Sequence, residues 1–154
     1  MTEIEIFWPA AYPLDAVHTT DALLSEAGIQ ATYRRAPMRR GPETYALVLL
    51  AGHTLQPFLR AVFERIGADA YSGLLTFVRG LIGRKPAADA PDGVVFECVR
   101  TRAQFVFTHG LPDAAYRQAL ALDPGTAPGR WAWQDDRQTW IRFEERAETG
   151  GPAG

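Results

Sequence analysis

The sequence predicts an α+β domain: a mixed or antiparallel sheet with its helices mainly on one face and two β-hairpins at the C-terminal end. Segments with strand periodicity stand among longer segments with helical periodicity, but they do not alternate regularly enough for a doubly wound fold. The 154 residues, 47% of them hydrophobic, suit one domain with its own core. We expect that domain over residues 1–144 and a flexible polar tail over residues 145–154.

The chain opens with a predicted strand and a predicted helix. Residues 3–8 alternate between acidic and apolar side chains before Pro9, which predicts a half-buried strand that the proline ends. A helix then begins at Asp15 or Thr20, and Gly28 is a suitable C-terminal stop for it. The opening therefore reads as a strand followed by a helix.

Two further strands follow this helix. Residues 29–35 predict the second strand of the sheet. A loop over residues 36–42 contains two prolines and a glycine, and we expect it to be exposed. Residues 45–50 are then continuously apolar, which predicts a strand that is buried on both faces.

The middle of the chain is predicted to be helical, with one interruption. Residues 55–66 place their apolar side chains at helical spacing, Gly67 interrupts the stripe, and residues 71–82 resume it until Gly83. The following residues 84–93 are polar and rich in proline, so we expect a mobile loop there.

The C-terminal part predicts two hairpins around a short helix. The first hairpin pairs residues 94–99 with residues 104–108, and the second pairs residues 130–134 with residues 139–143. Between them, residues 112–122 predict a helix, because a proline suits its first turn and a Pro-Gly pair ends it.

Composition excludes several classes of protein. The single cysteine cannot form an intramolecular disulfide, and the N-terminus lacks the basic start and apolar run of a secretory signal, so we expect a cytoplasmic protein. The most apolar stretch, residues 55–82, contains five charged side chains, which argues against a membrane span. Residues 34–85 are the basic part of the chain, with nine bases and three acids.

His53 and Thr54 lie between a predicted buried strand and a predicted helix, where open sheets often bind ligands. Thr54 as a helix N-cap with a bystander histidine is one interpretation. The other is a ligand pocket shared with His109, which follows an apolar strand. The histidines show no i, i+4 spacing and the cysteine no Cys-x-x-Cys pattern, so we expect no metal and no cofactor.

Four arginines form the sharpest cluster of charge. Arg34, Arg35, Arg39 and Arg40 surround the proline loop. They form either a solvated loop, a patch for an acidic protein surface, or a site for nucleic acid or nucleotide. The sequence pI of about 5.9 is far from the strongly basic value of a dedicated nucleic-acid binder, so we expect no nucleic-acid partner.

Three of the four tryptophans, Trp131, Trp133 and Trp140, lie on the last predicted hairpin. Trp131 and Trp133 share a face by strand alternation, and Trp140 lies close to them across the turn. The cluster is either part of the core or an exposed protein interface at a sheet edge.

No catalytic residue emerges from the sequence. Cys98 lies on a predicted strand beside Phe96, which indicates a buried structural thiol. Neither Ser25 nor Ser72 stands in a Gly-x-Ser-x-Gly pattern, and Asp135-Asp136 falls at a predicted hairpin tip.

These observations predict a small, non-catalytic interaction or regulatory module, such as an adaptor, an immunity-type inhibitor or an accessory subunit of a bacterial system, with a protein partner. The alternative is a small-molecule-binding domain or enzyme whose pocket surrounds His53, since histidine suits proton transfer near neutral pH.

Overall fold

The computed structural model describes residues 2–9, 12–36, 45–50, 60, 64, 68–86, 88, 90–122 and 129–143. The strands are β1 (Thr2–Pro9), β2 (Ile29–Ala36), β3 (Tyr45–Leu50), β4 (Gly93–Cys98), β5 (Ala103–Thr108), β6 (Gly129–Gln134) and β7 (Thr139–Phe143). The helices are α1 (Asp15–Glu26), α3 (Ala70–Ile82) and α4 (Asp113–Ala121). The strands form one sheet in the order β2-β1-β3-β4-β5-β6-β7.

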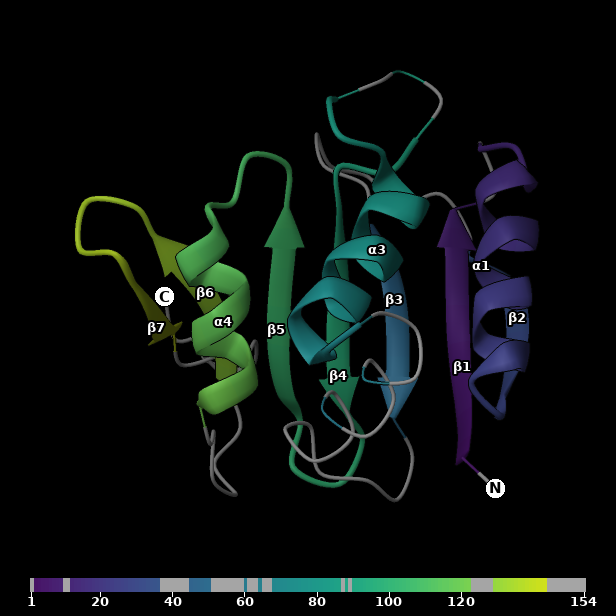
Figure 1. Ribbon diagram of the computed structural model, residues 1–154, viewed down its shortest axis with the longest axis horizontal. Helices are drawn as coiled ribbons and strands as arrows, with labels where there is room; N and C mark the ends of the chain where they lie inside the picture. The colour runs from purple at the N-terminus through teal and green to yellow at the C-terminus, as the bar shows by residue number, and fades with distance from the viewer. Residues whose placement is uncertain are drawn as a thin grey trace, which may run out of the picture.

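The sheet is mixed and consists of three β-α-β units and one added strand. The pairs β1/β2, β3/β4 and β5/β6 are parallel, and α1, α3 and α4 lie between their two strands in sequence. Neighbouring units, and β7, are joined by antiparallel pairing. The described helices α1, α3 and α4 lie on the same side of the sheet, which is the near side in Figure 1. The predicted α+β fold is therefore confirmed.

Both predicted hairpins are present. β4 and β5 pair antiparallel, and β6 and β7 do the same around the turn Asp135–Gln138. Arg102 and Gln138, the residues just before β5 and β7, have positive φ values of 63° and 52°. A left-handed residue at the end of a short loop is a common way to lead the chain back into the second strand.

Local signals explain where the helices begin and end. The Asp69 side chain accepts a 2.8 Å hydrogen bond from the Ser72 backbone N–H and so caps the start of α3. α1 and α3 each end beside a glycine with positive φ, Gly28 at 79° and Gly83 at 78°. Most of the predicted helix over residues 55–66 lies outside the described residues. No helix of the described ranges is both long and apolar enough to cross a membrane.

The core fills the space between the sheet and the helices. Its largest fully buried side chains include Trp8, Phe77, Phe96, Phe105 and Phe107. Phe96 joins two of them, with its ring centroid 5.8 Å from Phe77 on α3 and 5.4 Å from Phe107 on β5. Burying an aromatic side chain of this size contributes about 1.5–3 kcal/mol, so this layer holds the helices to the sheet.

The burial of β3 differs from the prediction. Ala46, Val48 and Leu50 are fully buried on the helix side, whereas Tyr45, Leu47 and Leu49 are half-buried on the other. The prediction of burial on both faces assumed layers on both sides of the sheet. The described helices cover only one side, so the second face of β3 remains partly exposed.

Candidate functional site

One side of the sheet faces away from the described helices, and we call this side the helix-free face. Strand alternation places every second residue of each strand on this face. Its members are set by the register, because their sequence neighbours belong to the core under the helices. No helix among the described residues lies on this side (Figure 1).

An apolar row crosses the centre of the helix-free face. Phe7, Leu47, Val95 and Val106 stand opposite one another on β1, β3, β4 and β5. Phe7 and Leu47 are half-buried, whereas Val95 and Val106 are only 4% and 8% exposed. A continuous apolar row across four strands is typical of a surface that packs against another layer.

A polar row runs beside the apolar row. It contains Glu5, Leu49, Glu97, Gln104 and Arg130, which are paired in that order from β1 to β6. The Gln104 side-chain amide donates a hydrogen bond to the Glu97 carboxylate, and Arg130 Nε donates to Gln104 Oε1 at 3.2 Å. The polar groups of this row therefore bond to one another along the sheet.

The described charged side chains of the helix-free face are linked to one another. At the outer strand, Arg34 Nε donates to the Glu5 carboxylate at 2.8 Å. Glu97 is linked to Arg130 through Gln104. Among the described side chains of this face, Glu5 and Glu97 thus stand with Arg34 and Arg130.

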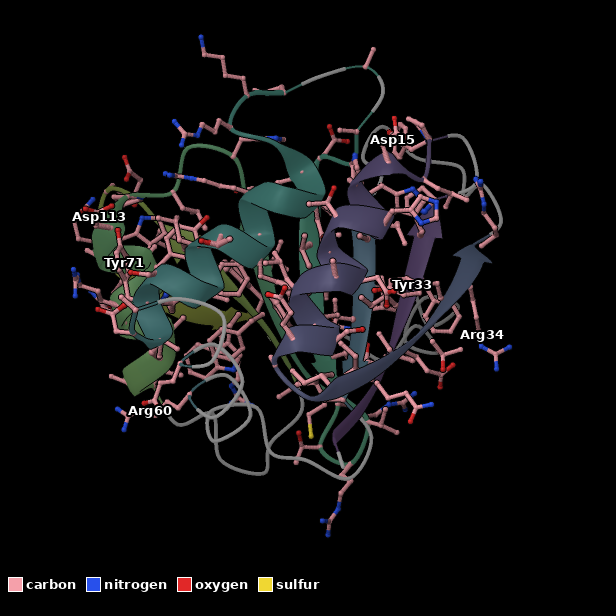
Figure 2. All side chains as sticks on the ribbon, turned by 45° about the vertical axis from the view of Figure 1, so that its right-hand side comes forward. Asp15, Tyr33, Arg34, Arg60, Tyr71 and Asp113 are labelled. Atoms are coloured by element: carbon pink, nitrogen blue, oxygen red, sulfur yellow. The ribbon has the colours of Figure 1, made fainter. Side chains whose placement is uncertain are left out.

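The predicted arginine patch is divided between two sides of β2. Arg34 projects away from α1 (Figure 2). The Nη1 of the adjacent Arg35 donates to the Tyr12 carbonyl at 3.3 Å. Successive residues of a strand point to opposite faces, so these two cannot grip one anion together. Arg39 and Arg40 lie outside the described residues.

The tryptophan hairpin packs largely against the core. Trp140 is 4% exposed, and its indole ring contacts Phe105 and Phe107 at centroid distances of 5.4 and 5.3 Å. Trp131 stacks on Phe105 at 5.7 Å and Trp133 contacts Trp140 at 5.9 Å, and both are half-buried. Trp140 therefore belongs to the core, which is one of the two interpretations of this cluster.

His109 lies close to the end of α3. Its Nε2 is 2.8 Å from the Ile82 carbonyl, which can only accept, so the nitrogen donates this hydrogen bond. The bond satisfies one of the free carbonyls at the helix end. His53 and Thr54 lie outside the described residues, so the predicted pocket around them stays a prediction.

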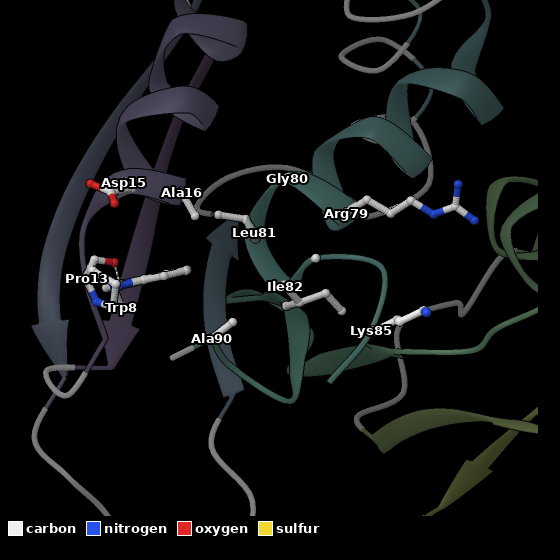
Figure 3. A pocket seen from close by; sticks show the side chains of 11 residues that line it. Trp8, Pro13, Asp15, Ala16, Arg79, Gly80, Leu81, Ile82, Lys85 and Ala90 are labelled. Carbon is white, nitrogen blue, oxygen red and sulfur yellow. Dashed lines mark hydrogen bonds between the residues drawn. The ribbon is translucent and has the colours of Figure 1, made fainter. Parts of the chain in front are cut away.

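A shallow pocket of about 290 Å³ lies between the start of α1 and the end of α3 (Figure 3). Trp8 and Asp15 line one side of it, and Arg79 and Lys85 the other. The indole N–H of Trp8 already donates to the Pro13 carbonyl at 3.1 Å. The volume is at the low end for small-molecule sites, and the lining offers no nucleophile beside a base.

Tyr71 and Tyr33 each lie at a contact between a helix and a neighbouring element. Tyr71 on α3 receives the Arg117 guanidinium over its ring at 4.1 Å, and a hydrogen bond with Asp113 raises the pKa of its phenol (Figure 2). Burial, and secondly the charge of Asp21, raises the pKa of Tyr33 beneath α1. These contacts join α3 to α4 and α1 to β2.

Cys98, Asp135 and Asp136 lie in the places that the sequence predicts for them, a strand and a hairpin turn. Cys98 is 1% exposed and forms no disulfide, and it lies on the helix side of β4. Asp135 and Asp136 are exposed in the turn of the last hairpin, where Gln138 Nε2 donates to the Asp135 carbonyl at 2.7 Å. Among the described residues, no three His, Cys, Asp or Glu side chains gather closely enough to hold a metal ion.

Comparison with known proteins finds no matching family model, no similar curated protein and no similar solved structure. A function therefore has to be argued from the geometry of the chain itself. The feature that the sequence reasoning missed is the helix-free face. Its signal was present in β3, whose outward residues Tyr45, Leu47 and Leu49 are all apolar.

Proposed function

We propose that this chain is a non-catalytic protein-interaction module that docks onto an apolar, neutral protein surface through its helix-free face. The observation that carries the proposal is the apolar row of Phe7, Leu47, Val95 and Val106 on a side that no described helix covers. Phe7 and Leu47 are the partly exposed members of this row, and apolar side chains exposed beside one another are characteristic of protein-binding surfaces.

The polar groups of this face support the same function. Glu5, Glu97, Gln104 and Arg130 already have partners within the chain, so a docking protein need not supply charges to match them. Satisfied polar groups at the rim and apolar groups at the centre are the usual anatomy of an interface. Adaptors, immunity-type inhibitors and accessory subunits are proteins that act in this way, and one buried cysteine outside any disulfide suits a cytoplasmic setting.

Native mass spectrometry of the protein, purified gently from its own host, tests this function. We expect a stoichiometric complex for the wild type, because an apolar face gains free energy when a partner covers it. Leu47→Asp should abolish the complex, since it places a charge in the apolar row. Thr76→Asp, on the exposed side of α3, is the matched control and should leave the complex intact.

Both variants must first show the circular dichroism spectrum of the wild type. A wild-type protein that is always a bare monomer would count against the proposal. So would a complex that survives Leu47→Asp in a folded protein.

A further inference from the structure

β2 is the outermost strand of the sheet on the side of β1 (Figure 1). All eight of its residues, Ile29–Ala36, pair with β1 in one unbroken parallel register. On its other side, no strand lies among the described residues. Alternate residues of such a strand direct their backbone N–H and C=O groups outward, so β2 presents a row of donors and acceptors along its outer edge.

The edge of β2 lacks most of the features with which proteins protect an edge strand. Protected edge strands are short, bulged, or interrupted by proline or charge. β2 is eight residues long, its register with β1 contains no bulge, and residues 29–33 include neither proline nor a charged side chain. β7, at the opposite edge of the sheet, has only five residues. The edge of β2 is therefore long enough to pair with a strand of ordinary length.

We propose that the outer edge of β2 binds an extended segment of a partner protein by β-strand addition. Only a chain in extended conformation can bond to successive groups of such a row, so the chemistry of the edge selects this occupant. The edge is separate from the helix-free face, and the proposal therefore goes beyond the function proposed above. We expect antiparallel addition, because antiparallel pairs are slightly more stable per residue than parallel ones.

The side chains of β2 indicate the pattern of the segment. Ala31 and Tyr33 lie on the helix side, half-buried at the margin of the core. An added strand would place every second side chain beside them, where apolar groups gain free energy by burial. On the other face, Gln30 and Thr32 are exposed, so polar side chains suit the alternate positions. The segment should therefore alternate between apolar and polar residues.

Arg34 indicates an acidic residue in the segment. Its side chain is 60% exposed and projects outward beside β2 (Figure 2). Its Nε donates to the Glu5 carboxylate at 2.8 Å, whereas its two terminal nitrogens have no partner among the described residues. A guanidinium carries five N–H donors, so it can hold a second carboxylate. Because Arg34 lies toward the C-terminal end of β2, antiparallel addition places this carboxylate in the N-terminal half of the segment.

Selection from a library of random peptides of eight residues, the length of β2, tests the proposal with the intact chain as bait. The enriched peptides should alternate between apolar and polar residues and carry an acid in their N-terminal half. Methylation of their backbone nitrogens, one at a time, then shows whether the peptide backbone makes the contact. Because an added strand bonds through every second residue, methylation at alternate positions should weaken binding about tenfold, and methylation at the positions between should have little effect.

Proline substitutions in β2 provide a matched pair of variants. Of Ala31→Pro and Thr32→Pro, one removes an N–H that points outward and the other removes a bond to β1. The first should keep the circular dichroism spectrum of the wild type and lose the peptides, whereas the second should destabilise the sheet. Arg34→Gln should weaken the binding of acidic peptides. Leu47→Asp, on the helix-free face, should still bind the peptides, because it leaves β2 unchanged.

Several results would overturn the proposal. A selection that enriches no peptide would mean that the edge takes no extended segment. Peptides that tolerate methylation at every position would bind through their side chains, and peptides that bind a folded proline variant of each kind as well as the wild type would bind elsewhere.

Amide hydrogen exchange on the wild type alone adds an independent check of the edge. The outward N–H groups of β2 should exchange rapidly at every protein concentration. Protection of every β2 amide in the monomer would mean that the chain covers this edge itself, and protection that rises with concentration would make a second copy the occupant. Each of these results would overturn the proposal for β2 and leave the test of the helix-free face through Leu47→Asp unaffected.

Discussion

The indole N–H of Trp140 donates a 2.8 Å hydrogen bond to the backbone carbonyl of Ala115. The bond is buried and connects the last strand to α4, 25 residues earlier in the chain. On the neighbouring strand, the Trp131 indole N–H is also buried but has no partner among the described residues. Within one hairpin, the indole N–H of Trp140 is therefore hydrogen-bonded, whereas that of Trp131 is buried without a partner among the described residues.

Replacing each tryptophan by phenylalanine should separate these effects. Trp140→Phe removes this buried hydrogen bond together with part of the indole ring contact, and should lower the free energy of unfolding by about 2–3 kcal/mol. Trp131→Phe removes a donor that makes no bond, so its loss of ring contact is partly offset, and the change should be below about 1 kcal/mol. Urea denaturation of both variants gives the comparison. Equal losses would contradict the assignment of the two indoles.

Asp69 should give α3 an acid-sensitive N-terminus. Its hydrogen bond from the Ser72 backbone N–H, assisted by the Ser72 side chain, holds the pKa of the carboxyl below its usual value. A lowered folded-state pKa means that the ionised carboxylate stabilises the fold above the unfolded pKa of about 3.9. This contribution is lost as the pH falls through the folded-state pKa.

Thermal melts at several pH values check this expectation. Asp69→Asn keeps a capping oxygen but no charge, so the wild type should melt higher at pH 7 and the gap should close below about pH 4. Asp69→Ala should melt lower still, with a pH dependence like that of Asp69→Asn. A gap that widens in acid would have the wrong sign for a lowered pKa.

Thr20 offers a stabilising substitution. Its hydroxyl is fully buried on α1 and has no hydrogen-bond partner among the described residues. Thr20→Val keeps the branched shape and removes the unsatisfied group, so we expect a gain in the free energy of unfolding of up to about 1 kcal/mol. Thr19→Val is the control, because the Thr19 hydroxyl is exposed and already donates to the Asp15 carbonyl at 3.2 Å. A Thr20→Val protein that unfolds more easily than the wild type would show that the hydroxyl is bonded.

Much of the fold could be predicted because its signals are local. The helices stop at Gly28 and Gly83 because glycine readily adopts a positive φ. The two hairpins follow from the turn residues that stand between apolar runs. The division of Arg34 from Arg35 also follows from alternation within the predicted strand, although the sequence reasoning grouped them as one patch.

The candidate site could not be predicted in the same way. Which strands are neighbours depends on pairing between residues far apart in sequence, such as Leu49 with Glu97. An apolar strand such as β3 reads the same whether one or two layers cover it. Only the three-dimensional arrangement shows that the described helices lie on one side and leave the other side without a helix from the described residues.

Gly93 lies on the helix-free face, close to the β5 backbone and the Tyr45 ring, so its replacement should disturb the packing there. A Cβ at this position would stand 2.6 Å from the Phe107 carbonyl oxygen and 2.9 Å from the Tyr45 ring. Gly93→Ala must therefore displace both the β5 backbone and the Tyr45 side chain, and overpacking of this kind costs about 1–3 kcal/mol. Gly80→Ala is the matched control, because its Cβ would meet only Thr20 Oγ1, at 3.6 Å. Since alanine favours a helix over glycine, that variant should be neutral or more stable by about 0.5–1 kcal/mol. Denaturant unfolding separates the two variants, and a Gly93→Ala protein as stable as the wild type would refute the close approach of Tyr45 to the strand.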